Sequence, residues 1–366
     1  MSSPLVTVLH VVGGMDLRGG AASVAIDLAS IQLSGIESAV WMHRDFRPSE
    51  GGPTFVTAGR VSRVGSIATD FRSAFREMAP LCSWVRGRRA VLHAHSRFGI
   101  FASCLVGRLS GVPVVIHIHA LPNHPCLYRW LRRLAPGIMI YNSRKTCCHF
   151  GDDPATAQIL MPSIQWPAEP AVEVKGRSRF VAAGAFVPSK HFHLLVEAFR
   201  HLQSEGLDAR LVIFGLSDSP LDRDHQQTII TACRRNESIC LEQWAPNWSS
   251  RLTSGDIFVH LGKPESFGIV LLEAFARGCR LVILPETFVD DLPDPVRYKG
   301  VYRVKEFSPR AIGEAMKDAS QGVDSTQDLW QDRESMRRLF SAEGSSAALS
   351  RLYHELVGRT AYDNCT

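Results

Sequence analysis

The chain has 366 residues, 45% of them hydrophobic and 21% charged, and a formal net charge of +5. This is the composition of an ordinary soluble globular protein, long enough for two domains with substantial cores. No run of eighteen apolar residues occurs, so no transmembrane helix is predicted, and the nine cysteines show no CxxC pair or zinc-finger spacing. We therefore expect free thiols in a reducing cytoplasm.

Strands and helices are predicted to alternate along the first half of the chain. Apolar runs indicate strands at 5–12, 37–42, 90–95, 113–119 and 138–142. Helices are predicted between them, among others at 21–33 and at 69–78, the latter ending ahead of Pro80. The N-terminus lacks a basic segment and is interpreted as the first strand rather than a signal peptide.

Glycines follow the first predicted strand. Gly13-Gly14 and Gly19-Gly20 precede a helix, so the backbone could approach a ligand closely there. The G-x-G-x-x-G fingerprint of a dinucleotide site is absent. Glycines at a strand end are also common turn formers, and the sequence leaves both interpretations open.

A linker is predicted at 165–176, which has two prolines, mixed charge and no periodicity. It separates a first domain at 1–165 from a second at 176–345, with a C-terminal helix at 346–366. Strands of the second domain are predicted near 179–184, 210–215, 239–241, 256–261 and 280–284. Repeated strand–helix alternation predicts an α/β fold of doubly wound parallel sheets.

Two carboxylates stand where a strand passes into a helix. Glu265 lies in the loop after an apolar run, and Glu273 lies inside a helix predicted to begin after Gly268 and to end at Gly278. A helix N-terminus favours a diphosphate, and ionised carboxylates accept hydrogen bonds from sugar hydroxyls. The alternative is an amphipathic helix whose glutamates face water, and the pair alone is weak evidence for a site.

The residues around this pair carry a family resemblance. Residues 265–278 read E-S-F-G-I-V-L-L-E-A-F-A-R-G, which resembles the E-G-F-G-x-x-x-x-E-A-x-A-x-G pattern of retaining GT-B glycosyltransferases of family 4, the glycosyl transferases group 1. Ser266 replaces the usual first glycine. Segments at 114–119, 138–143, 180–190 and 211–215 follow in the family's order, so the resemblance covers about residues 5–285.

The resemblance implies a fold and an activity. The fold is GT-B: two Rossmann-like domains facing a cleft, an acceptor-side first domain, a nucleotide-sugar-binding second domain and a final helix that crosses back to the first. The activity is retaining, metal-independent transfer from a UDP- or GDP-type sugar to a glycan or lipid-linked acceptor, in surface polysaccharide assembly. No cofactor besides the donor is implied.

The resemblance also implies roles for single residues. Lys190 and the N–H groups at Gly268 would stabilise the departing phosphate, Glu265 would hold donor-sugar hydroxyls, Glu273 the ribose, and His119 would face the reacting sugar. The remaining donor-binding residues implied are Ser266, Phe267, Gly19, Gly20 and Gly184. For His119 the alternative is an ordinary buried histidine, and His117, on the same face of the strand, is a second candidate.

One departure from the family pattern bears on activity. Where family members commonly carry Arg after the first strand of the second domain, this chain has Ala185, although Lys190 remains at the Lys position. Lys263 is a candidate replacement for the missing cation. An inactive GT-B scaffold serving as a binding or regulatory subunit is therefore the alternative function. An NAD-type oxidoreductase is disfavoured because the dinucleotide fingerprint is missing.

Two histidine pairs and one basic segment also bear on possible ligands. His93 with His95, and His191 with His193, resemble metal-binding pairs, but neither has a carboxylate or cysteine at ligand spacing, so no metal site is predicted. The basic amphipathic segment 127–134 fits an ordinary surface helix or a contact with an anionic membrane. Nucleic acid is not an expected partner. We expect a cytoplasmic protein, with peripheral contact at the inner face of the membrane as the further alternative.

Overall fold

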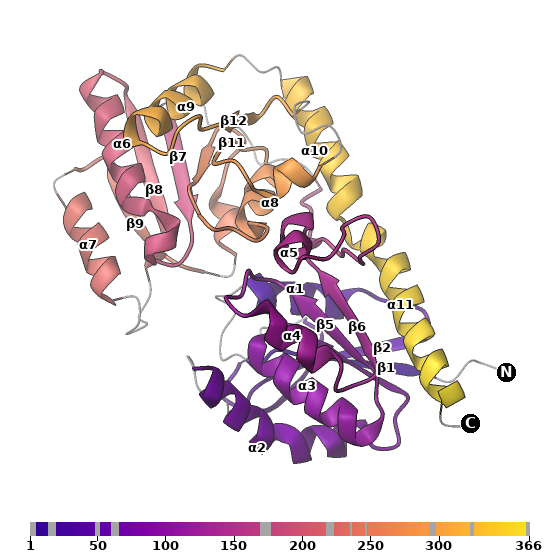
Figure 1. The fold of residues 1–366 in the computed structure, drawn as a ribbon. Helices are drawn as coiled ribbons and strands as arrows, with labels where there is room; N and C mark the ends of the chain where they lie inside the picture. The colour runs from indigo at the N-terminus through magenta and orange to yellow at the C-terminus, as the bar shows by residue number, and fades with distance from the viewer. Residues whose placement is uncertain are drawn as a thin grey trace. The chain divides into compact units, whose positions relative to one another are not determined.

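The computed structural model describes residues 5–13, 20–47, 52–59, 66–168, 177–216, 223–234, 236–245, 247–292, 298–322 and 326–363. The chain forms two compact units (Figure 1). The first comprises residues 1–165 and 340–366, and the second comprises residues 166–339. Gly14 and Gly19, named above as candidate ligand contacts, lie outside the described residues.

The first unit is built on a sheet of six parallel strands in the order β3-β2-β1-β4-β5-β6. The strands are β1 (Val6–Val11), β2 (Ile36–His43), β3 (Thr54–Gly59), β4 (Ala90–Ala94), β5 (Val114–Ile118) and β6 (Gly137–Tyr141). The helices are α1 (Gly20–Ser30), α2 (Ile67–Val85), α3 (Arg97–Ser110), α4 (Pro125–Arg132), α5 (Arg144–His149) and α11 (Ala342–Asp363). Every residue of β4 and β5 is buried, as expected for central strands covered by helices on both faces.

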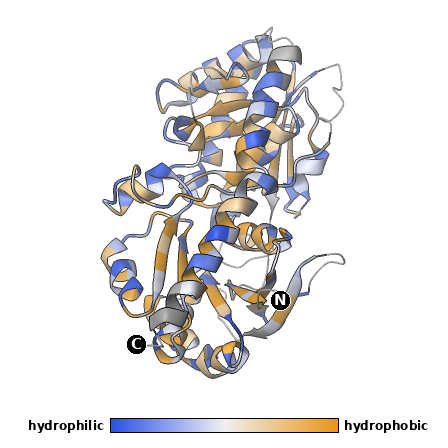
Figure 2. Cartoon of the chain, turned by 90° about the vertical axis from the view of Figure 1, so that its right-hand side faces the viewer, coloured by the Kyte–Doolittle hydropathy of each residue, from blue (hydrophilic) through white to orange (hydrophobic). Residues whose placement is uncertain are grey.

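The second unit also has six parallel strands, in the order β12-β11-β10-β7-β8-β9. The strands are β7 (Ser178–Ala183), β8 (Ala209–Leu216), β9 (Ile239–Gln243), β10 (Ile257–His260), β11 (Arg280–Ile283) and β12 (Val301–Arg303). The helices are α6 (Phe192–Ser204), α7 (Arg223–Cys233), α8 (Ile269–Ala276), α9 (Pro309–Gln321) and α10 (Thr326–Phe340), with single 3₁₀ turns η1 (Pro188–Lys190), η3 (Trp248–Arg251) and η4 (Phe288–Asp291). Figure 2 shows hydrophobic residues concentrated along the strands.

Each sheet has the strand order 3-2-1-4-5-6 when its strands are numbered along the chain. This is the order of a Rossmann fold, and it confirms the predicted class of doubly wound parallel sheets. The order reverses between β1 and β4 in the first unit and between β7 and β10 in the second. Ligands of such sheets bind beyond the carboxyl ends of the strands at this point. A ligand site is therefore expected beyond β1 and β4 in the first unit and beyond β7 and β10 in the second.

Two details of the prediction differ from the structure. The helix expected to end ahead of Pro80 continues as α2 to Val85, because Leu81 and Val85 are buried in the core and their packing outweighs the hydrogen bond that Pro80 cannot make. The edge strands β3 and β12 were not predicted, since short edge strands have little apolar periodicity to recognise.

The C-terminal helix α11 packs on β1 and β4 of the first unit. Its Tyr353 is buried and its hydroxyl lies 2.7 Å from Nδ1 of His93. Among the described residues, no helix is both long enough and apolar enough to span a membrane.

Candidate active site

A lysine, a glutamate and a histidine meet at the reversal point of the second unit. Lys190 Nζ donates to Glu265 Oε2 at 2.7 Å, and His260 Nε2 lies 3.0 Å from the same oxygen. Lys190 ends the turn η1 that follows β7, His260 ends β10, and Glu265 lies in the loop between β10 and α8. Two loops at the carboxyl ends of neighbouring strands thus converge on one carboxylate.

The backbone of both loops is shaped for this contact. Gly184 follows β7 with φ +151°, a conformation that L side chains rarely adopt, and a Cβ there would lie 3.6 Å from Cε of Lys190. The N–H of Lys263 donates to the carbonyl of Ser189 at 2.9 Å. The loop that carries Glu265 is therefore tied directly to the turn that carries Lys190.

Gly262 is needed beneath this contact. A Cβ on Gly262 would lie 2.7 Å from Nε2 of His260 and 2.9 Å from Oε2 of Glu265. Both distances are shorter than any ordinary van der Waals contact. The His260–Glu265 hydrogen bond therefore requires glycine at this position.

Charge and hydrogen bonding keep Glu265 ionised. Burial by itself would raise the pKa of Glu265, but the hydrogen bond with His260 and the ammonium of Lys190 outweigh it and pull the pKa well below its ordinary value. Burial lowers the pKa of His260, so this imidazole is neutral at pH 7 and can donate its Nε2–H to the carboxylate.

Glu273 lies in α8 and has a different environment. Trp248 Nε1 donates to Glu273 Oε2 at 2.9 Å, and Trp248 is almost completely buried against Phe214 and Phe258. Burial raises the pKa of Glu273 to about 7, although the Trp248 hydrogen bond and the charge of Arg277 oppose the shift. The two glutamates of the motif are thus held by separate sets of partners and differ in charge state near neutral pH.

The residues between the two glutamates form the entry to α8. Gly268 is the N-cap with φ +87°, and the backbone N–H of Ser266 donates to Glu265 Oε1 at 3.2 Å. Phe267 is buried and its ring stacks on Phe288 with 4.8 Å between centroids. The first N–H groups of a helix lack intrahelical partners, so α8 offers amide donors beside Glu265.

Two positions bear on the missing arginine. Ala185 is exposed just after β7. The Lys263 side chain is exposed in the loop tied to η1. Lys190 and Lys263 therefore place two cations on adjoining loops at the same edge of the sheet.

In the first unit, His119 follows β5 and is partly exposed. Its Nε2 lies 2.9 Å from Nδ1 of His95, and its backbone carbonyl accepts from Nδ2 of Asn142 at 3.3 Å. Burial lowers its pKa to about 3, so the imidazole is neutral. His117 is buried two residues earlier, and Gly20 is the exposed first residue of α1.

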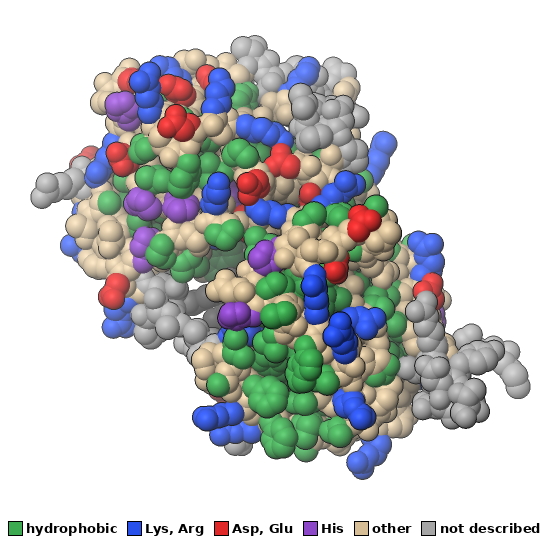
Figure 3. Space-filling view, viewed as in Figure 1, with side chains coloured by type: hydrophobic (Ala, Val, Ile, Leu, Met, Phe, Trp, Pro, Cys, Tyr) green, Lys and Arg blue, Asp and Glu red, His purple; other side chains and the backbone are tan. Residues whose placement is uncertain are grey.

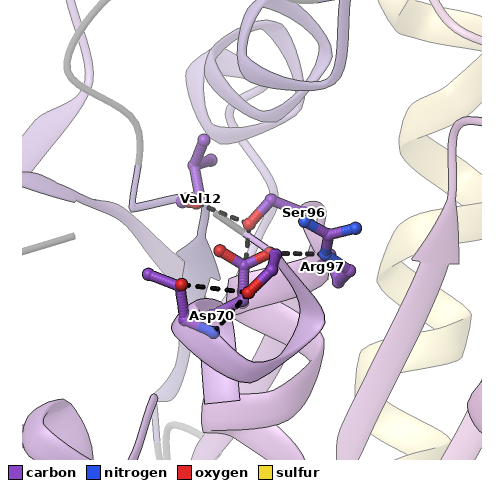
Figure 4. A network of polar contacts seen from close by, with 7 residues as sticks. Val12, Asp70, Ser96 and Arg97 are labelled. Carbon is purple, nitrogen blue, oxygen red and sulfur yellow. Dashed lines mark hydrogen bonds and ion pairs between the residues drawn. The ribbon is translucent and has the colours of Figure 1, made fainter. Parts of the chain in front are cut away.

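Polar contacts anchor the reversal point of the first unit (Figure 4). Ser96 caps α3 by accepting from the N–H of Gly99 at 2.9 Å, and its hydroxyl donates to the carbonyl of Val12 at 2.6 Å. The next residue, Arg97, forms an ion pair with the buried Asp70 of α2. These contacts connect the end of β1 with the starts of α2 and α3.

Comparison with known proteins gives the family of the second unit. Residues 168–319 match the sequence model of the family glycosyl transferases group 1. The second unit is a glycosyl transferases group 1 domain. No curated protein sequence matches the chain. The glycosyl transferases group 1 domain contains Lys190, His260, Glu265 and Glu273, so the contacts described above belong to the matched segment.

Solved structures share the fold of the whole chain. HepE of Anabaena, crystallised with UDP and glucose, is 12% identical with a TM-score of 0.73, covering 94% of this chain and 98% of its own. Sucrose-phosphate synthase of Thermosynechococcus elongatus is 12% identical with a TM-score of 0.75, covering 98% and 100%. The catalytic domain of starch synthase IV of Arabidopsis thaliana, bound to ADP and acarbose, is 13% identical with a TM-score of 0.71, covering 97% and 100%. The fold is therefore GT-B.

Three residues of the glycosyl transferases group 1 domain contribute to the contacts but were not singled out from the sequence. They are His260, Gly262 and Trp248. A histidine that ends a buried strand five residues before Glu265 was a usable signal for the first, and the glycine that ends this run was a signal for the second. Trp248 reaches Glu273 across 25 residues, and no local pattern predicts that contact.

Proposed function

We propose that this protein is a retaining glycosyltransferase that moves a sugar from a UDP- or GDP-type donor to a glycan or lipid-linked glycan acceptor in surface polysaccharide assembly. The observation that carries the proposal is the Lys190–Glu265 contact beside the N-terminus of α8, at the reversal point of a glycosyl transferases group 1 domain. HepE, crystallised with UDP-glucose, supports a nucleotide-sugar as the donor class.

The donor diphosphate would take its stabilisation from the second unit. Lys190, Lys263 and the amide donors at Gly268 and Ile269 present positive charge and N–H groups at one edge of the sheet. As the bond from the sugar to the diphosphate breaks, negative charge accumulates on the departing phosphate, and fixed donors in a partly desolvated site stabilise it strongly. In this proposal Lys190 and Lys263 together neutralise the phosphate charge that the family's arginine, replaced here by Ala185, would otherwise neutralise.

The two glutamates would bind different hydroxyl groups. Glu265 stays ionised and would accept from hydroxyls of the donor sugar. Glu273 would accept from the ribose hydroxyls, with Trp248 fixing the orientation of its carboxylate. Because burial raises the pKa of Glu273 to about 7, this contact would strengthen as the pH rises through neutrality.

Transfer would proceed with retention. The acceptor oxygen bonds to the anomeric carbon on the face from which the diphosphate leaves, and the departing phosphate oxygen takes the acceptor's proton. The first unit would supply the acceptor site and His119, whose neutral ring can hydrogen-bond to a sugar hydroxyl. No metal ion takes part in this proposed sequence of bond changes.

An exposed apolar surface supports a membrane-associated acceptor. Large hydrophobic side chains are exposed on three helices of the first unit: Ile67, Phe71 and Phe75 on α2, Leu109 on α3 and Trp130 on α4. Figure 3 shows hydrophobic side chains gathered over these helices with Lys and Arg side chains around them. Exposed arginines of α2 and α4 accompany them: Arg72, Arg76, Arg129 and Arg132. Apolar residues flanked by cations are the features that bind an anionic lipid surface.

The transferase proposal is tested by titrating UDP-, GDP- and ADP-sugars into the purified protein by calorimetry, with Glu273→Ala alongside. Binding of a UDP- or GDP-sugar that is lost in the variant supports it, and release of the nucleotide in the presence of a glycan acceptor establishes transfer. Binding without turnover under any acceptor would favour the alternative, an inactive GT-B scaffold with Ala185 as the reason. An absence of binding to every nucleotide-sugar would contradict both.

A further inference from the structure

Five histidines gather on one side of the central strands of the first unit. His10 lies in β1, His93 in β4 and His117 in β5, while His95 and His119 directly follow β4 and β5. These three strands are neighbours in the sheet, and residues two apart on a strand share a face. Four of the five side chains are at most 2% exposed, and only His119 is partly exposed.

The rings are in direct contact. His10 Nδ1 lies 3.0 Å from His95 Nε2, His95 Nδ1 lies 2.9 Å from His119 Nε2, and His93 Nε2 lies 3.3 Å from His117 Nδ1. The rings of His117 and His119 are 3.9 Å apart between centroids. Burial keeps these imidazoles neutral by lowering their pKa values, and the neutral ring is the form that binds metal ions.

We propose that His95, His117 and His119 bind one divalent transition-metal ion of the zinc type. One ring nitrogen from each lies within 4.8 Å of the others. Imidazole nitrogens bound to Zn²⁺ at about 2.0–2.1 Å in tetrahedral geometry are about 3.3 Å apart, so small side-chain movements would bring the three nitrogens onto one ion. Three histidines with an open fourth position form a recurrent zinc coordination set.

The choice of three among the five follows from exposure. His10, His93 and His95 also have nitrogens within 4.8 Å of one another, but all three are buried. An ion there would have three imidazole ligands, but because all three residues are buried no solvent reaches it to supply a fourth ligand or to let it enter. Since His119 is partly exposed, an ion bound to it can enter from solvent and keep a water molecule as its fourth ligand.

The remaining two histidines would orient the ligands. His10 contacts His95 and His93 contacts His117, and the Tyr353 hydroxyl of α11 fixes His93 in turn at 2.7 Å. Outer hydrogen bonds of this kind set the tautomer and ring orientation of metal-binding histidines. The proton shared by His95 Nδ1 and His119 Nε2 would move to the other nitrogen of its own ring, so both residues stay neutral and both lone pairs face the ion. His119 then carries its proton on Nδ1, and this N–H is the group that would contact the sugar hydroxyl in the proposed function.

The test uses the full chain, purified without a metal-affinity step, stripped with a chelator and titrated with Co²⁺. We expect one ion per chain with the visible absorption of tetrahedral Co²⁺, displaced by Zn²⁺. His117→Ala and His119→Gln should each weaken binding more than about 100-fold, and His10→Ala, which removes an orienting contact, by about 10-fold. The matched control is His201→Ala, whose side chain is exposed on α6, and it should bind as the wild type.

Two results would overturn the proposal. One is that the wild-type protein binds Co²⁺ no more tightly than a variant in which both His117 and His119 are replaced. The other is binding that survives both His117→Ala and His119→Gln but is lost in His10→Ala, which would assign the ion to the buried trio. His119→Gln, at the partly exposed position, keeps the test decisive if His117→Ala fails to fold, with circular dichroism as the check. None of these readouts depends on sugar transfer.

Discussion

Lys190 Nζ and Glu265 Oε2 lie 2.7 Å apart although 75 positions separate the two residues in the chain. The contact joins the loop after β7 to the loop after β10, the two strands between which the sheet order reverses. It holds a cation and a carboxylate against each other at this edge of the sheet. A bound diphosphate would then compete with Glu265 for the lysine, so donor binding and the Lys190–Glu265 contact are expected to be linked.

The lysine of this pair can be tested against a matched surface pair. Lys190→Met should lower kcat/KM for sugar transfer by about 10²–10³-fold, because a donor fixed toward the departing phosphate is lost. Lys317→Met is the control, since Lys317 pairs with Glu205 at 2.9 Å on the exposed surface. Steady-state kinetics with both variants checks this, and equal losses in the two would contradict the assigned role.

The charge of Glu265 predicts a pH dependence of stability. Its pKa is lower in the folded state than its ordinary value of 4.5, so its ionisation stabilises the fold above that pH and the contribution is lost as the pH falls below it. Glu265→Gln should therefore lower the melting temperature at pH 7, and the difference from wild type should shrink below about pH 4.5. Thermal unfolding followed across pH measures it. A difference that is the same at every pH would show that the charge is not responsible.

Ionisation of Glu273 is expected to destabilise the fold, the opposite of the effect expected for Glu265. Its folded pKa of about 7 exceeds the ordinary 4.5, so wild-type stability relative to a neutral side chain is lost as the pH rises from 4.5 through 7. Glu273→Gln should be more stable than wild type at pH 8, by about 1–2 kcal/mol once the partial exposure of the side chain is allowed for. The same variant should bind the nucleotide-sugar more weakly.

Both properties of Glu273→Gln can be followed in one preparation, by thermal unfolding and by calorimetric titration. Asp256→Asn provides the contrast, because the carboxylate of Asp256 is paired with Arg179 and its neutralisation should destabilise the fold. A Glu273→Gln protein that melts at the wild-type temperature at pH 8 would mean that burial does not raise this pKa.

Gly262 should not tolerate a side chain. A Cβ in Gly262→Ala would lie 2.7 Å from His260 Nε2, so the His260–Glu265 hydrogen bond must break or the loop must move. We expect a loss of about 1–3 kcal/mol in unfolding free energy and weaker donor binding. Gly358→Ala is the control, since a Cβ there meets no atom within 4 Å in α11, and it should be neutral or stabilising. Chemical denaturation of both variants checks the contrast.

Membrane contact is tested at the two exposed phenylalanines of α2. Phe75 is 61% exposed and Phe71 is 44% exposed. The double variant Phe71→Ser, Phe75→Ser should lose binding to vesicles that contain phosphatidylglycerol, while activity on a water-soluble acceptor is kept. Phe307→Ser, which alters an exposed phenylalanine of the second unit, is the control. Cosedimentation with the vesicles measures the bound fraction. Equal binding by the wild type, the double variant and Phe307→Ser would show that this surface does not bind membranes.

The sequence predicted the central strands correctly, but it did not predict the full length of α2 or the edge strands. Alternation of apolar runs with helical segments predicted the doubly wound fold, because each central strand is buried on both faces and its pattern is local. The helix across Pro80 was predicted wrongly, since local proline chemistry was outweighed by the burial of Leu81 and Val85. The edge strands β3 and β12 were missed for the related reason that their pairing depends on a neighbouring strand.

What the sequence alone determined was the succession of elements, the helix that begins after Gly268, and the spacing from Glu265 in the preceding loop to Glu273 in that helix, all of which depend on residues close in the chain. Only the tertiary structure decided which side chains share an environment. It joined Lys190 and His260 to Glu265, placed Trp248 against Glu273, and brought together five histidines that lie in, or directly after, three neighbouring strands. The strand order determines which of these side chains meet. Burial acts to raise the pKa of both glutamates, but only Glu265 has the contacts with His260 and Lys190 that lower its pKa, and both partners reach it through the tertiary fold.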